Sequence, residues 1–114
     1  MDNCLFCKII KGDIPANKVY ENEHILAFRD IDPKAPVHIL VIPKKHIKSI
    51  NDLKSSDKYL AGELILASKK IAKDQGIDSR GFRTIFNTND DGGQTVYHIH
   101  MHIMGGRQMK WPPG

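Results

Sequence analysis

Three of the chain's six histidines lie in one short segment, where His98, His100 and His102 alternate with apolar residues. Successive side chains of a β-strand point to opposite faces. A strand over residues 96–104 would therefore bury the apolar side chains and place all three imidazoles on the other face. Imidazole titrates near neutral pH and serves as a base, a nucleophile or a metal ligand. A half-exposed strand with outward polar residues is the alternative, but three histidines in register favour a reaction centre.

These three histidines cannot all bind one metal ion. At about 3.3 Å per residue, His98 and His102 stand about 13 Å apart along a strand. A zinc–nitrogen bond measures only about 2.0–2.1 Å, so one ion could gather two neighbouring imidazoles and hardly all three. The three side chains must therefore have different roles.

Cys4 and Cys7 form a C-x-x-C motif at the start of the chain and are its only cysteines. A reduced C-x-x-C is either a redox pair or half of a zinc site. Redox pairs usually lie in a thioredoxin-like βαβ pattern, which we do not find in this sequence. A structural zinc takes about four nitrogen or sulfur ligands, so two histidines would complete the site, and His46 and His98 are the candidates. This choice leaves the last two histidines of the alternating segment free for chemistry.

Charge and hydropathy restrict the environment and the partners. The N-terminal residues lack the apolar core of a secretory signal, and no stretch approaches the ~20 apolar residues of a membrane span. We therefore expect a cytoplasmic protein, in which thiols stay reduced. The net charge of +4, from 17 basic and 13 acidic residues, suits an anionic small molecule. The densest basic runs are the pairs Lys44-Lys45 and Lys69-Lys70, so neither nucleic acid nor a membrane is an expected partner.

The length of 114 residues, with 40% hydrophobic and 26% charged residues, predicts a single globular domain over residues 1–114. A short helix is predicted over residues 3–11, with Asn3 as its N-cap and Gly12 at its end. Apolar runs bounded by turn residues predict strands over residues 18–21, 25–30, 37–42, 82–88 and 96–104. Residues 49–53 are expected to form one helical turn.

One long helix is predicted over residues 56–75, with Ser56 as its cap and Gly76 after its end. Its apolar face is expected to comprise Leu60, Ala61, Leu64, Ile65, Ala67, Ile71 and Ala72. The strands come in hairpin order and are interrupted by one helix rather than by repeated βαβ units. This order favours an α+β fold with a five-stranded antiparallel sheet.

The chain resembles the histidine triad (HIT) superfamily, and specifically its Hint branch. The superfamily signature is histidine–apolar–histidine–apolar–histidine–apolar–apolar, which residues 98–104 match. Further segments that resemble Hint proteins are residues 28–31 with the loop of Pro33 and Pro36, residues 41–46, residues 91–94 and the tail 105–114. The resemblance implies the HIT-like fold and a homodimer whose two five-stranded sheets join, with the tail crossing the dimer interface.

The characteristic reaction of this branch is hydrolysis of the P–N bond of purine nucleoside 5′-phosphoramidates through a covalent nucleotidyl-histidine. The resemblance places the nucleophile at His100, oriented by the backbone carbonyl of His98. It places hydrogen bonds near the leaving group at His102 and Thr95. Hint proteins more often carry serine at the latter position, and threonine adds a methyl group and a stiffer χ1. His38 matches a further histidine beside the triad, which either tunes protonation or is an ordinary core histidine.

The resemblance also implies a binding site for a purine nucleoside monophosphate, AMP or GMP. Asp30 matches the carboxylate that holds both ribose hydroxyls. Asn87 and the backbone amides of Gly93, Gln94 and Thr95 should face the α-phosphate. Six apolar residues match positions around the base, namely Leu5, Phe6, Ile9, Phe28, Ile31 and Leu40. The predicted nucleotide site is completed by His100, His102 and Trp111.

Some HIT relatives bind zinc with an N-terminal C-x-x-C and two histidines, which match Cys4, Cys7, His46 and His98. The resemblance therefore implies a structural zinc that ties the N-terminal helix to the triad segment, and no organic cofactor. Such a zinc would also orient the backbone carbonyl that holds the nucleophile.

Two rival functions accompany this interpretation. The first is hydrolysis of dinucleoside polyphosphates, as in the Fhit branch of the superfamily; the Trp-Pro-Pro-Gly ending at residues 111–114 belongs to the Hint pattern and argues against it. The second is a nucleotide-binding interaction protein with vestigial catalysis. The intact triad argues against a complete loss of activity.

Overall fold

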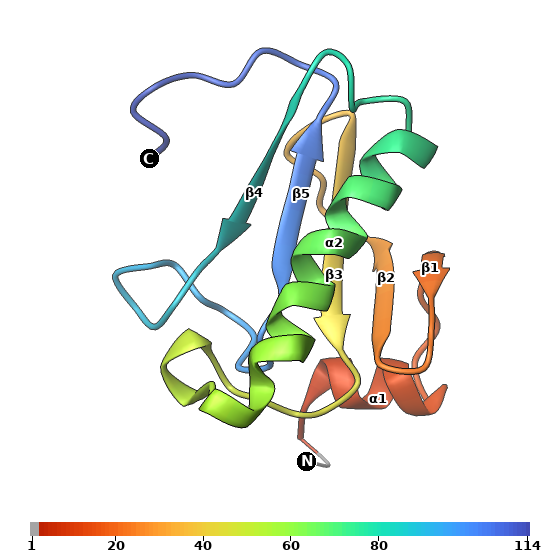
Figure 1. The fold of residues 1–114 in the computed structure, drawn as a ribbon, viewed down its shortest axis with the longest axis vertical. Helices are drawn as coiled ribbons and strands as arrows, with labels where there is room; N and C mark the ends of the chain where they lie inside the picture. The colour runs from red at the N-terminus through yellow and green to blue at the C-terminus, as the bar shows by residue number, and fades with distance from the viewer. Residues whose placement is uncertain (1–2) are drawn as a thin grey trace.

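The chain forms one five-stranded antiparallel sheet with strand order β1-β2-β3-β5-β4 (Figure 1). The computed structural model describes residues 3–114. The strands are β1 Lys18–Glu21, β2 Ile25–Arg29, β3 Val37–Pro43, β4 Phe82–Phe86 and β5 Met101–Gly105, and the helices are α1 Leu5–Lys11 and α2 Lys58–Asp74. Two 3₁₀ turns, Ile50–Asp52 and Ser55–Asp57, precede α2. The predicted α+β class, with one long and one short helix, is confirmed.

Residues that alternate along the three inner strands, β2, β3 and β5, build a separate core on each face of the sheet. Figure 1 shows α2 lying across one face, where its side chains pack on Ile25, Ala27, Ile39, Val41, Met101 and Ile103. On the other face α1 contributes Phe6 and Ile9, which pack on Leu26, Phe28, Leu40 and Ile42. Because β2 and β3 are covered on both faces, they read as continuous apolar runs.

The last strand is shorter than predicted. It begins at Met101 rather than Val96, because its partner strand ends at Pro43. Met101 pairs with Val41, so the next ladder positions would bring Ile99 opposite Pro43, which has no N–H to donate. The amide of Ile99 donates instead to the carbonyl of Ile47. The histidine segment is therefore half strand and half extended loop.

Both helices begin later than predicted. The N-cap of α1 is Cys4 rather than Asn3, since the Cys4 sulfur accepts a hydrogen bond from the Cys7 amide at 3.3 Å. Gly12 ends this helix in the left-handed conformation, as predicted. The helix α2 begins at Lys58, and the residue before it is Asp57 rather than Ser56.

The start of α2 is delayed because Asp57 is engaged in a 3₁₀ turn. Its carboxylate accepts from the Lys54 amide at 2.9 Å and pairs with the Lys45 ammonium at 2.7 Å. The predicted apolar face holds for Leu64, Ala67, Ile71 and Ala72, which are buried. Ile65 is 60% exposed, because it is turned about 100° from its neighbour Leu64.

Smaller differences concern element ends. The strands β2 and β4 end at Arg29 and Phe86, earlier than predicted, and α2 ends at Asp74. The predicted helical turn at residues 49–53 is the 3₁₀ turn Ile50–Asp52, capped by the Ser49 hydroxyl. Within residues 3–114, none of the helices has the length and apolar character needed to cross a membrane.

Candidate functional site

The three histidines of the alternating segment lie on the side of the sheet opposite α2, and the first two contact Phe6 of α1. His102 pairs with Leu40 in the sheet and so shares the face of the α1 core. The ring of Phe6 meets the rings of His98 and His100 edge-on, with centroid distances of 5.9 and 5.1 Å. The intervening apolar residues Ile99, Met101 and Ile103 are buried, as predicted. The first two imidazoles are buried as well, because α1 covers them.

Cys4, Cys7, His46 and His98 come together although they lie far apart in the sequence. The two Nδ1 atoms of His46 and His98 are 3.1 Å apart, and three sulfur–nitrogen distances measure 3.4, 3.4 and 3.6 Å. A tetrahedral zinc with two sulfur and two nitrogen ligands requires about 3.3 Å between nitrogens and about 3.5 Å between sulfur and nitrogen. The four donors therefore fit a zinc-sized ion.

The protonation of this cluster suits a cation. A backbone carbonyl can only accept, so the Nε2 of His98 carries the proton that it donates to the Pro43 carbonyl at 2.8 Å. The Nδ1 lone pair of His98 then faces the two thiols. Burial lowers the pKa of His98 to about 4, so this ring is neutral at pH 7. Burial and the neighbouring Cys4 raise the pKa of the Cys7 thiol, which favours the protonated form. A bound cation would act in the opposite direction and favour the thiolate.

His100 is held in one tautomer by the backbone. Its Nδ1 lies 2.8 Å from the carbonyl of His98 and must donate to it. The Nε2 of His100 therefore carries a lone pair. Burial lowers the pKa of His100, which keeps this ring neutral. A buried, neutral imidazole with a fixed lone pair is suited to nucleophilic attack.

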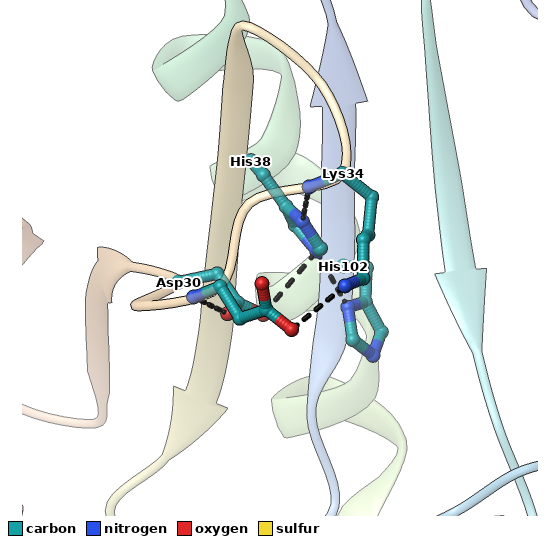
Figure 2. Close-up of polar contacts among 5 residues, drawn as sticks. Asp30, Lys34, His38 and His102 are labelled. Atoms are coloured by element: carbon teal, nitrogen blue, oxygen red, sulfur yellow. Dashed lines mark hydrogen bonds and ion pairs between the residues drawn. The ribbon is translucent and has the colours of Figure 1, made fainter.

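A chain of hydrogen bonds holds His102 in the other tautomer, with its proton on Nε2 instead of Nδ1 (Figure 2). The Lys34 amide donates to Nδ1 of His38 at 3.0 Å, so the proton of the neutral His38 ring lies on Nε2. That Nε2 lies 2.9 Å from Nδ1 of His102 and donates to it. His102 consequently keeps its proton on Nε2, which is buried and has no partner among residues 3–114. Burial lowers the pKa of His102 to about 4, so it is a neutral donor at pH 7.

Asp30, His38 and His102 form a second cluster of possible metal ligands. One carboxylate oxygen of Asp30 accepts from the Asp32 amide at 2.8 Å, and the other lies 3.5 Å from Nε2 of His38. A metal would need the Nε2 lone pair of His38, yet the Lys34 amide forces the proton onto that atom. This cluster is therefore a hydrogen-bond network rather than a metal site.

The predicted nucleotide residues divide into a buried and an open group. Phe6, Ile9, Phe28 and Leu40 are buried in the α1 core, Asp30 and Asn87 are partly exposed, and Leu5, Ile31, Gly93, Thr95 and Trp111 are exposed. Leu5 and Thr95 line a cavity of about 350 Å³ beside the cysteines, together with His46 and Tyr97. The exposed residues are thus available to a ligand.

In the loop at residues 89–94, two of the three amides predicted to face a phosphate are hydrogen-bonded within the loop. The amides of Gly93 and Gln94 donate to the carbonyls of Asp90 and Asn89, which closes the turn on itself. The Gln94 side chain is buried and donates to the carbonyls of Lys48 and Val96. Gln94 therefore braces the loop that leads into the histidine segment.

The comparisons with known proteins agree with the fold and with the histidine pattern. A family model described as HIT domain matches residues 11–109. An uncharacterized HIT-like protein of Synechococcus elongatus is 50% identical over 113 residues, which cover 99% of this chain and 98% of that protein. The chain therefore belongs to the HIT family.

Solved structures extend this similarity. A HIT family hydrolase from Legionella pneumophila superposes with a TM-score of 0.97 at 56% identity, covering 98% of this chain and all of that one (100%). A histidine triad nucleotide-binding protein from Candida albicans has a TM-score of 0.82 at 33% identity, covering 96% and 83% of the two chains. These similarities to proteins of known structure support the predicted HIT-like fold.

Burial of neutral imidazoles predicts that the fold is weakened by acid. Burial lowers the pKa of His38 and takes that of His102 from 6.5 to about 4, so their contribution is complete above about pH 6.5 and is lost as the pH falls toward 4. Each such histidine reduces the free energy of unfolding by at most about 1.4 kcal/mol per pH unit. His102→Gln should make this slope shallower in urea titrations between about pH 6.5 and 4. An unchanged slope in His102→Gln would contradict the assignment.

Proposed function

We propose that this protein is a Hint-branch hydrolase that cleaves the P–N bond of purine nucleoside 5′-phosphoramidates through a nucleotidyl intermediate on His100. The observation that carries the proposal is the 2.8 Å hydrogen bond from His100 Nδ1 to the His98 carbonyl. This bond leaves Nε2 with a lone pair beside His102, whose ring centroid is 5.0 Å away and whose Nε2 carries a free proton. A nucleophile and a hydrogen-bond donor are thus held side by side.

The reaction needs two displacements at phosphorus. In the first, the Nε2 lone pair of His100 forms a bond to phosphorus and the P–N bond breaks. The amine leaves with the bonding electron pair and takes up a proton from solvent, which the attacking water returns in the second step. In the second, water attacks phosphorus and the bond to His100 breaks, which releases a nucleoside monophosphate and the neutral imidazole. We assign the donor of His102 and the hydroxyl of Thr95 to the leaving-group side. The imidazole nitrogen is a good nucleophile because its lone pair is already oriented.

The nucleotide would bind on the α1 side of the sheet, at the surface formed by the exposed residues there. Asp30 is a partly exposed carboxylate at the end of β2, suited to accept hydrogen bonds from both ribose hydroxyls. Leu5 and Ile31 offer exposed apolar surface, and Phe6 and Phe28 supply buried aromatic rings in the α1 core, residues that suit a purine base. The nucleotide-binding name of the Candida albicans relative supports this class of ligand.

We further propose that Cys4, Cys7, His46 and His98 hold one structural zinc. The fit of their donor atoms to a tetrahedral site supports this assignment. Zinc would link α1 to the histidine segment and restrain His98, whose carbonyl orients His100. No step of the reaction requires the metal itself.

A homodimer would give the exposed tail a role. Trp111 is 83% exposed, and Figure 1 shows the C-terminal tail extending past the edge strand β4. Tyr59, Ile65 and Leu66 on α2 are also exposed apolar side chains. We propose that a second copy of the chain covers these exposed side chains of α2. In this dimer, Trp111 reaches the leaving-group side of the partner's site.

His100→Gly should abolish phosphoramidate turnover, because it removes the attacking nitrogen. We expect a loss of at least about a thousandfold in kcat and no nucleotidyl adduct by intact-protein mass spectrometry. Binding of AMP, measured by calorimetry, should remain. His24→Gly is the matched control. Near-parental turnover by His100→Gly would refute the assignment of His100 as the nucleophile.

The reaction class is tested separately, with a substrate panel of AMP and GMP phosphoramidates and a dinucleoside tetraphosphate.

Protein purified without chelators should contain about one zinc per chain by atomic emission, the stoichiometry of one closed four-ligand site. His46→Gln should lose the metal and melt at a lower temperature, because the link between α1 and the histidine segment is broken. His24→Gln should retain both metal and melting temperature. Metal-free parental protein with an unchanged melting temperature on zinc addition would contradict the site.

Deletion of residues 109–114 should change substrate preference more than stability, since the tail adds little to either core. The ratio of kcat/KM between bulky and small amine leaving groups should shift about fivefold or more, the effect of about 1 kcal/mol. Lys110→Ala, which lies within the deleted segment but keeps Trp111, is the control and should behave like the full chain. A truncated protein that stays dimeric in sedimentation and treats the panel like the full chain would rule out this role.

A further inference from the structure

One proton in the site has two possible acceptors. His38 is buried, and its Nδ1 is occupied by the Lys34 amide, so the neutral ring has a single proton to donate, on Nε2. Nδ1 of His102 lies 2.9 Å from this atom, and a carboxylate oxygen of Asp30 lies 3.5 Å from it. Figure 2 shows both contacts converging on the same edge of the His38 ring.

The choice of acceptor decides what His102 can do. When the proton is directed to His102, that ring must keep its own proton on Nε2, which faces away from His38 in Figure 2. When the proton is directed to Asp30, nothing holds His102 in this tautomer. A carboxylate is the stronger acceptor by charge, while His102 has the shorter distance. The two arrangements therefore compete.

The carboxylate of Asp30 is held in place to take part in this competition. Its first oxygen is anchored by the Asp32 amide at 2.8 Å, which keeps the second oxygen toward His38. The nearby carboxylate of Asp32 forms an ion pair with Lys34, whose ammonium lies 2.7 Å from one of its oxygens. Asp30 thus remains the acidic group that contacts His38, and its side chain is 18% exposed, open to a ligand.

We propose that Asp30 is a positioning residue that couples binding of the ribose diol to the hydrogen-bond donor of His102. This inference rests on the proposed function, in which Asp30 receives the two ribose hydroxyls. Those hydroxyls donate to the carboxylate and satisfy its oxygens, so the proton of His38 is left to His102. The donor on Nε2 of His102 is then fixed when the substrate is bound. The ribose hydroxyls therefore accelerate the chemical step, beyond their part in binding.

A kinetic cycle between substrate and variant tests this coupling. The substrates are an adenosine 5′-phosphoramidate and its 2′,3′-dideoxy analogue, compared by single-turnover rates at saturation. The parental protein should lose about tenfold or more in rate with the dideoxy substrate, the effect of one lost hydrogen bond in the transition state. His38→Gln carries two N–H donors on one nitrogen and can serve Asp30 and His102 together. Its rate should differ less than about twofold between the two substrates.

Two other variants complete the cycle. His38→Leu has no donor and should be slow with both substrates, whereas His24→Gln, at an exposed histidine outside the site, should behave like the parent. The coupling is refuted if the ribose hydroxyls affect only KM in the parent, or if His38→Gln shows the parental rate loss. Absence of any turnover of the ribose substrate by the parent would instead count against the proposed function.

Nitrogen NMR of the histidine rings gives a readout that does not require turnover. With ¹⁵N-histidine-labelled parental protein, AMP should move His102 to the shifts of a pure Nε2–H tautomer. The 2′,3′-dideoxy nucleotide should leave averaged shifts of two tautomers. Identical His102 shifts with both nucleotides, or no response to AMP, would overturn the inference whatever the activity of the protein.

Discussion

The site is organised around one residue, His98, whose side chain and backbone are both committed to hydrogen bonds in a region shielded from solvent. The imidazole donates to the Pro43 carbonyl and turns its other nitrogen toward the two cysteines. The carbonyl of the same residue accepts from the His100 ring. A buried polar atom without a partner costs about 1–3 kcal/mol. Rotating the ring of His98 or His100 out of its hydrogen bond is therefore unfavourable. The candidate metal cluster and the candidate nucleophile are thus restrained together.

Backbone groups, which can act in only one direction, determine the tautomers of the whole site. The carbonyls of Pro43 and His98 only accept, and the amide of Lys34 only donates. From these three groups the proton position follows on His98, His100 and His38. The shorter contact of His38 Nε2 is with His102, whose own Nε2 has no partner within residues 3–114. Burial keeps the pKa values of these imidazoles low, so the tautomers persist at neutral pH. At neutral pH the site therefore offers the lone pair on Nε2 of His100 and the N–H donor on Nε2 of His102, and both rings are uncharged.

The sequence predicted most elements because their signals are local. A continuous apolar run placed the central strand that ends at Pro43, and Gly12 marked the end of α1. The start of the last strand was missed because it depends on register. Only when Val41 is known to pair with Met101 does the missing N–H of Pro43 explain why the ladder stops. Similarly, the cap of α1 shifted to Cys4, whose sulfur accepts the hydrogen bond expected of Asn3.

The sequence by itself determined the chemical inventory: alternating histidines, a C-x-x-C motif, two further histidines and the family pattern that relates them. These signals lie in side chains, which differ from residue to residue and can be read in order. The resemblance already implied the His98 carbonyl at the His100 ring. Only the tertiary structure showed that Asp30 and His102 both lie near Nε2 of His38, and that the Pro43 carbonyl and the Lys34 amide meet the rings of His98 and His38. Backbone groups are chemically alike at nearly every position. Residue types alone therefore carry no mark of which backbone group faces an imidazole until the chain has folded.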